Sequence, residues 1–221
     1  MVSLAGCRAL VTGTPTGVGL ALARRLAKEG ARLALVGPDP TTLEHVVTSL
    51  ASTTGCMVVG YRADLTSETD TQALYSCIER DFDQLDLLIH ADDTTAALDL
   101  PAAEEIDVDD RPVALAPYLL ARRLLPLLRA PQGQVMFVTF TRRSIADAIR
   151  IEVNREGVRM ISVMLDHAGA MAPPDPPDGD RRRPRQRTIP PDDLASLLLT
   201  VLMMPQGTEV TDVSVRAMSL I

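Results

Sequence analysis

The sequence has no tryptophan and only three tyrosines and three phenylalanines among 221 residues. A folded core must therefore be packed mainly from aliphatic side chains. Hydrophobic residues make up 46% of the chain, which excludes an intrinsically disordered protein. The length suffices for one domain with a sizeable core, and we predict a single domain over residues 1–221.

Basic residues are also scarce relative to acidic ones, since the formal net charge is −7 and no helix carries a basic stripe. This argues against nucleic acid as a partner. No apolar run reaches the length of a membrane span and no signal peptide pattern is present, so we predict a cytoplasmic protein without membrane association. The three cysteines, Cys7, Cys56 and Cys77, lack metal-ligand spacing, and we predict free thiols and no metal site.

Apolar runs of strand length alternate with segments of helical periodicity along the chain. The predicted strands cover residues 8–11, 32–36, 56–59, 85–89, 134–139, 159–164 and 210–216, and the predicted helices cover 20–29, 41–51, 68–81, 113–129, 144–156 and 192–204. This alternation predicts an α/β fold: a doubly wound, mainly parallel sheet of Rossmann type between helices on both faces, in three α/β/α layers. Ligands of such sheets bind beyond the carboxyl ends of the strands.

One segment, residues 173–187, breaks the pattern because it is rich in proline and arginine and has no periodicity. We predict a mobile surface loop there. A lid or a local anion site is the alternative interpretation.

The turn after the first strand has the sequence Thr12-Gly-Thr-Pro-Thr-Gly-Val-Gly19, and a helical segment follows it. Glycines in a strand–turn–helix unit let the backbone approach a pyrophosphate, and the free N–H groups of the first helical turn point at it. The context therefore predicts an anion site, with a small molecule such as a nucleotide as ligand.

The spacing of these glycines resembles that of the short-chain dehydrogenase/reductase family, and the resemblance extends over most of the chain. It implies NAD or NADP as the cofactor. The residues that match the family's cofactor-binding positions are Gly13, Thr14, Thr16, Gly17, Val18, Gly19, Asp64, Leu65, His90 and Ala91. The positions that set cofactor preference hold Thr16, Gly37 and Pro38, with Asp39 slightly beyond, and these residues indicate no preference.

The catalytic positions of the family are occupied differently here. The catalytic helix asparagine falls on Val113, and the strand that should end in the catalytic serine ends with Thr139 and Phe140. No tyrosine follows Tyr118 and no lysine follows Lys28, so the family's Tyr-x-x-x-Lys segment has no counterpart. We therefore predict a degenerate member whose ordinary hydride-transfer activity is lost. We predict Tyr118 to be a packing residue.

Asp92 and Asp93 stand where the family has small residues beside its cofactor. Ionised carboxylates pointing inward would oppose a dinucleotide through like-charge repulsion, whereas outward-pointing ones would leave the site open.

Two alternatives to a degenerate member remain on the sequence alone. One is an NAD(P)-dependent oxidoreductase with an atypical acid, for example Thr139, water or the substrate. The other is a redox-neutral isomerase, lyase or cyclase that uses polar residues at the strand ends. Those residues are His90, Asp92, Asp93, Thr139, Thr141, Asp166 and His167. They are also interpretable as ordinary polar residues of loop ends.

The resemblance also bears on assembly. The family commonly assembles through its long helices, which implies a homo-oligomer or a heteromer with a related subunit. Burial of the Leu119–Leu128 face by a partner would support this hypothesis.

Overall fold

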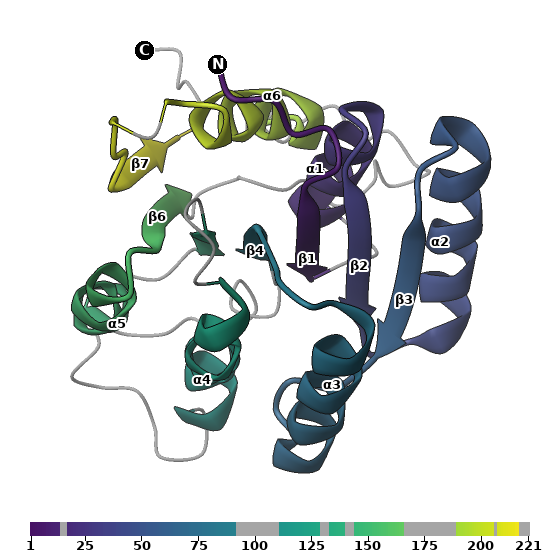
Figure 1. Cartoon of the computed structure of the whole chain (residues 1–221), viewed down its shortest axis with the longest axis horizontal. Helices are drawn as coiled ribbons and strands as arrows, with labels where there is room; N and C mark the ends of the chain where they lie inside the picture. The colour runs from purple at the N-terminus through teal and green to yellow at the C-terminus, as the bar shows by residue number, and fades with distance from the viewer. Residues whose placement is uncertain are drawn as a thin grey trace, which may run out of the picture.

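The computed structural model describes residues 1–13, 17–91, 111–128, 133–139, 144–165, 189–205 and 207–216, in which strands and helices alternate (Figure 1). The strands are β1 (Arg8–Thr12), β2 (Arg32–Gly37), β3 (Val58–Arg62), β4 (Leu87–His90), β5 (Gln134–Thr139), β6 (Arg159–Leu165) and β7 (Asp212–Val215). The helices are α1 (Gly17–Lys28), α2 (Pro40–Thr54), α3 (Glu68–Asp81), α4 (Arg111–Leu128), α5 (Ser144–Arg155) and α6 (Pro191–Leu202).

The strands form one seven-stranded sheet in the order β3-β2-β1-β4-β5-β6-β7, and every pair is parallel. β1 and β4 are neighbours in the sheet but are not consecutive along the chain. The order in which strands are added to the sheet reverses direction between them. This confirms the doubly wound Rossmann-type fold. The carboxyl ends of all strands consequently lie at one edge of the sheet, called here the carboxyl edge.

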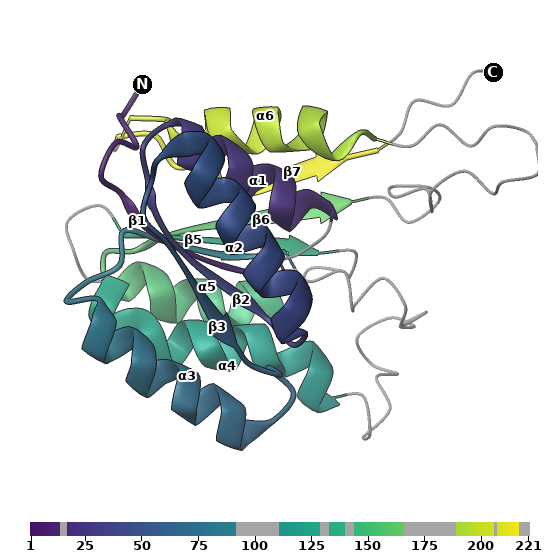
Figure 2. The same ribbon diagram turned by 90° about the vertical axis from the view of Figure 1, so that its right-hand side faces the viewer.

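The sheet is covered on both faces. Helices α1, α2 and α6 lie on one face, and α3, α4 and α5 lie on the other (Figure 2). Successive strand residues point to opposite faces. In β1, for example, Ala9 and Val11 pack among the first set of helices, whereas Leu10 packs among the second. The inner strands are therefore mainly apolar, as expected for a sheet buried on both sides, whereas the edge strand β7 is exposed at alternate residues.

Several elements extend beyond the bounds that periodicity predicts, and β3 and α2 each do so by three residues at their carboxyl ends. β3 runs to Arg62 because it pairs with β2 from Leu33 to Gly37, although Gly60 and Arg62 interrupt its apolar pattern. α2 continues three residues past the predicted end, to Thr54, and stops at Gly55, which adopts a positive φ of 68°. Local apolar periodicity does not detect either extension.

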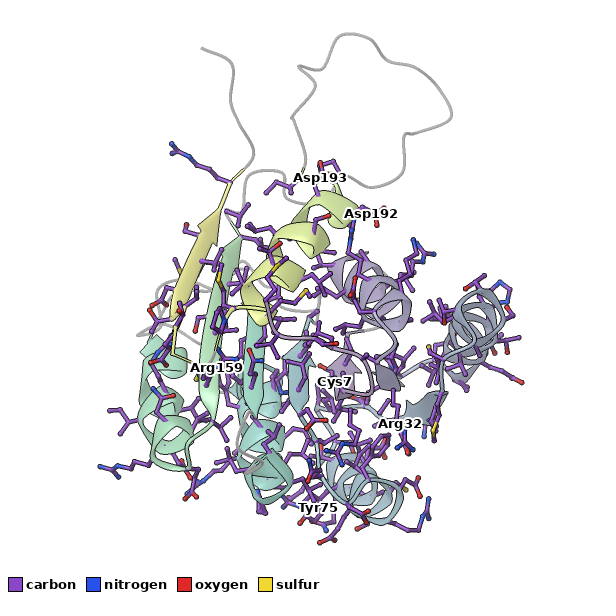
Figure 3. All side chains as sticks on the ribbon, turned by 45° about the horizontal axis from the view of Figure 1, so that its top comes forward. Cys7, Arg32, Tyr75, Arg159, Asp192 and Asp193 are labelled. Atoms are coloured by element: carbon purple, nitrogen blue, oxygen red, sulfur yellow. The ribbon has the colours of Figure 1, made fainter. Side chains whose placement is uncertain are left out.

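The amino edge of the sheet is held by polar contacts to backbone. Arg159, at the start of β6, donates from Nη1 to the carbonyl oxygen of Thr208 at 3.1 Å and lies within 3.4 Å of those of Met204 and Pro205. Figure 3 shows Arg159 well apart from Asp192 and Asp193, where α6 begins. The carboxyl edge, beyond which ligands of such sheets bind, lies at the other end of the strands.

Several sequence predictions concern residues outside the described part of the chain, among them the loop at 173–187. The three cysteines are described; they are free and partly buried. No described helix combines the length and the apolar character needed to cross a membrane.

Candidate functional site

The glycine-rich turn lies at the carboxyl edge, between the end of β1 and the start of α1. Gly13 follows β1 with a φ of 76°, and Gly17 opens α1 with a φ of 58°. Both values lie in the left-handed region, which residues with a Cβ rarely adopt. Thr14 and Thr16 are outside the described residues. The two glycines allow the chain to turn from strand to helix within a few residues.

Gly19, in the first turn of α1, lies against the backbone of the preceding strand end. A Cβ at this position would be 2.8 Å from the carbonyl oxygen of Gly13 and 3.4 Å from the Cβ of Ala91, which follows β4. Only a glycine fits without a shift of backbone atoms. The structure therefore brings Ala91, from a distant part of the sequence, next to Gly13 and Gly19 of the turn, and all three are residues predicted to line one site.

The first turn of α1 has no acidic side chain, so the partial positive charge at its N-terminus is not offset there. The neighbouring helix α6, which packs against α1, carries Asp192 and Asp193 in its first turn (Figure 3). The contrast favours an anion at the start of α1. The close approach of Gly19, together with the N–H groups of a first helical turn, which have no acceptor within the helix, fits a pyrophosphate and with it a dinucleotide.

His90, the last residue of β4, lies beside Thr12, the last residue of β1. The two are register partners, and Nδ1 of His90 shares a hydrogen bond of 3.0 Å with the hydroxyl of Thr12. The imidazole stacks on the ring of Phe137 in β5 with the ring centroids 4.9 Å apart. Phe137 in turn stacks on Tyr118 of α4 at 4.6 Å, which confirms Tyr118 as a packing residue.

Burial lowers the pKa of His90 to about 3, so the imidazole is neutral near pH 7. Its Nε2 atom has no hydrogen-bond partner among the residues that the structure describes. The stack on Phe137 places the ring on the α4 face of the sheet. The hydrogen bond between His90 and Thr12 thus connects the ends of β4 and β1. The glycine turn follows Thr12, and Ala91 follows His90. His90 was a candidate residue on the sequence alone, but its pairing with Thr12 was not predicted. Only the register of β1 and β4 reveals that pairing.

Asp64 and Leu65 follow β3 at the carboxyl edge, where the sequence predicts contacts to a cofactor. The exposed carboxylate of Asp64 accepts hydrogen bonds from the backbone N–H of Thr66 at 2.9 Å and from the Thr66 hydroxyl at 2.7 Å. These two bonds hold the pKa of Asp64 below its usual value. Leu65 is half-buried. The structure thus places both residues at the predicted edge.

β2 ends at Gly37, and the nearest acidic residue is Asp39, at the N-cap of α2. The carboxylate of Asp39 accepts a hydrogen bond from the backbone N–H of Thr42 at 2.8 Å and a second one from the Thr42 hydroxyl. The hydroxyl bond and then the backbone bond lower the pKa of Asp39. Asp39 therefore caps a helix and stays ionised at this edge.

The remaining polar residues proposed for chemistry are outside the described part of the chain: Asp92, Asp93, Thr141, Asp166 and His167. Thr139 ends β5. Among the described residues no group of three or more His, Cys, Asp or Glu side chains could hold a metal ion.

A family model for short chain dehydrogenases matches residues 8–141, from the start of β1 past the end of β5. The chain belongs to the short-chain dehydrogenase family. The match covers the glycine turn and the β4 end at the carboxyl edge, and also α4.

Comparison with individual proteins agrees with the assignment to the short-chain dehydrogenases. An uncharacterized oxidoreductase of Staphylococcus saprophyticus is 25% identical over 98% of this chain and 99% of its own length. The 2,3-dihydro-2,3-dihydroxybenzoate dehydrogenase of Bacillus subtilis is 35% identical over 37% of this chain and 31% of its own length. L-sorbose reductase from Gluconobacter frateurii, solved with NADPH and L-sorbose, aligns over 96% of both chains with a TM-score of 0.77 and 20% identity. At that identity, the structural likeness concerns the fold.

Proposed function

We propose that this short-chain dehydrogenase binds NAD or NADP at the glycine turn but does not carry out the family's tyrosine-dependent hydride transfer. It would act as a binding protein or as a subunit of an oligomer. The approach of Gly19 to the Gly13 carbonyl is the observation that carries the binding half of the proposal, since the turn keeps a geometry that only glycine allows. Solved relatives in complex with NADPH, NADP and NAD support a dinucleotide as ligand.

The catalytic half rests on the connection from β5 to α5. Four residues, 140–143, link Thr139 to Ser144, and their sequence is Phe-Thr-Arg-Arg. α5 itself has the sequence Ser-Ile-Ala-Asp-Ala-Ile-Arg-Ile-Glu-Val-Asn-Arg, with no tyrosine and no lysine. An arginine stays protonated near neutral pH and is a poor proton shuttle, so Arg142 and Arg143 do not substitute for the missing pair.

The bound nicotinamide would supply a hydride acceptor or donor. This chain's own contribution would be to orient it. Gly13, Gly19 and the first turn of α1 would hold the pyrophosphate, and the Thr12–His90 hydrogen bond would fix the strand end from which the turn departs. Tyr118 is not a replacement acid: it is buried against Phe137, and burial raises its pKa to about 12.

Oligomer formation is the second part of the proposal. Most leucines of the predicted Leu119–Leu128 face pack inside the chain, because Leu120, Leu124 and Leu128 are fully buried. Leu119 on α4 is 52% exposed, however, and Ile151 on the adjacent helix α5 is 60% exposed. These two side chains support an apolar contact with a second subunit.

Calorimetric titration with NADH and NADPH, followed by a single-turnover assay with aldehydes and ketones, tests the binding and the catalysis separately. We expect binding of at least one dinucleotide, weakened by Gly19→Ala and unchanged by Gly207→Ala, whose new Cβ meets no atom within 4 Å. We also expect no oxidation of the bound nicotinamide. Hydride transfer at a rate of about 1 s⁻¹ or more, ordinary for enzymes, would contradict the catalytic half.

Sedimentation velocity of the wild type and of the double variant Leu119→Ser/Ile151→Ser tests the oligomer. We expect the wild type to associate and the double variant to sediment as a smaller species. A wild-type protein that stays monomeric at all concentrations contradicts this part of the proposal and leaves the binding part intact.

A further inference from the structure

The ends of β2 and β3 lie side by side at the carboxyl edge, next to the strand that leads into the glycine turn. Gly37 and Arg62 are register partners, and the N–H of Ala63 donates to the carbonyl oxygen of Gly37 at 3.2 Å. When a pyrophosphate lies at the start of α1, the adenosine ribose is recognised by residues that follow the second strand. The side chains around Gly37 therefore meet the ribose of a dinucleotide bound as proposed above.

These side chains are predominantly acidic. Three carboxylates, Asp39, Asp64 and Asp70, accompany one guanidinium, that of Arg62. Asp39 and Asp64 are exposed, and their hydrogen bonds to Thr residues hold both pKa values below the usual one, so that they remain ionised. The group carries more negative than positive charge at pH 7.

Arg62 offsets only part of this negative charge, because one guanidinium faces three carboxylates. Its guanidinium is directed to Asp70, with Nη1 and the carboxylate oxygen 3.8 Å apart, and the side chain is 62% exposed. The same Asp70 oxygen accepts a hydrogen bond of 3.0 Å from the backbone N–H of Asp64. Gly37 has no side chain, and Pro38 offers neither a cation nor an N–H donor.

We infer that this part of the carboxyl edge accepts the ribose 2′-hydroxyl of NAD(H) and rejects the 2′-phosphate of NADP(H). A 2′-phosphate adds up to about two negative charges at a place where carboxylates already outnumber cations. A hydroxyl is neutral and adds none. Like charges within about one Debye length repel, and the effect weakens as salt is added. The inference rests on the proposed function, because it concerns the same bound dinucleotide.

The experiment is calorimetric titration of the full chain with NADH and NADPH, and with 5′-AMP and adenosine 2′,5′-bisphosphate as fragments, at low and high salt. We expect NADH to bind about tenfold more tightly than NADPH or better, the fragments to follow the same order, and the ratio to shrink at high salt.

Two variants remove charge while keeping the local hydrogen bonds: Asp39→Ser retains a helix cap, and Asp64→Asn retains an acceptor for Thr66. We expect each to lower the ratio of NADH affinity to NADPH affinity by about threefold to tenfold. Asp83→Asn makes the same charge change at an exposed site near the opposite edge and serves as the matched control. It should change neither affinity.

The outcomes separate the two proposals. Equal or tighter binding of NADPH, with no response to either variant, would overturn the NAD(H) preference and leave dinucleotide binding in place. Failure of every dinucleotide and fragment to bind would overturn the proposed function, and the preference with it.

Discussion

The substitution Gly19→Ala tests the close packing on which the proposed cofactor site depends. The new Cβ would lie 2.8 Å from the Gly13 oxygen and 3.2 Å from the Gly13 carbonyl carbon, both backbone atoms at the end of β1. No side-chain rotation relieves such contacts, so α1 or the turn must move. Overpacking of this kind costs about 1–3 kcal/mol. Alanine also regains about 1 kcal/mol of helix propensity over glycine.

Because the contacts are with rigid backbone, the overpacking cost belongs in the upper part of its range. After the gain in helix propensity is subtracted, the expected net loss in the free energy of unfolding is about 1–2 kcal/mol. For a chain of this size the loss corresponds to a fall in Tm of roughly 2–8 °C. Because the displaced atoms belong to the glycine turn, NADH affinity should fall by about tenfold or more.

Circular dichroism melts and urea titrations measure the stability, and calorimetry measures the affinity. Gly207→Ala is the matched control: nothing lies within 4 Å of the new Cβ and the glycine has no positive φ, so stability should rise slightly, by about 0.4–1 kcal/mol. A Gly19→Ala protein with wild-type Tm and wild-type NADH affinity would refute the argument from close packing.

Three further variants probe single contacts. Asp86 accepts bonds from the backbone N–H and the guanidinium of Arg8; burial raises its pKa, but these bonds outweigh burial and leave the pKa lowered. Asp86→Asn should therefore lower the free energy of unfolding by about 1–3 kcal/mol at pH 7. Urea titrations should show that this difference from wild type shrinks below about pH 4, and a difference that stays constant with pH would be contrary evidence. The folded-state pKa of His90 is depressed, so stability should fall with pH below about 6.5, by up to about 1.4 kcal/mol per pH unit from this residue. His90→Asn should remove that slope and the exposed His45→Asn should keep it; equal slopes would show that His90 is not the cause. Arg150 donates to oxygens of β6 and the start of β7, so Arg150→Ala should speed hydrogen exchange in β7 more than in β1, and unchanged exchange would show that the contacts do not hold the edge strand.

The fold could be predicted from the sequence because the pattern that produces it is local. Apolar runs such as 134–139 alternate with helical segments such as 68–81, and both correspond residue for residue to elements of the structure. Such an alternation leaves little choice but a parallel sheet between two helical layers. The glycine turn is equally local, since Gly13 and Gly19 are six residues apart in the sequence.

The cofactor edge could be predicted only in part, because its contacts join distant segments. His90 was recognised from its position after an apolar strand, but its partner Thr12 is 78 residues away. Likewise, Asp39 gave no cofactor preference as a sequence position. Its charge bears on cofactor preference only because β2 pairs with β3, which brings Arg62 and Asp64 to the same edge.

The sequence by itself determined the order of the elements, the place of the glycine turn and the absence of Tyr-x-x-x-Lys from α5, because each follows from residue identity within one short window. The tertiary structure alone decided that His90 is buried and neutral, that most of the α4 leucines face the core, and that carboxylates gather beside Gly37. These properties depend on burial and on the register between strands, and neither quantity is encoded by any single stretch of the chain.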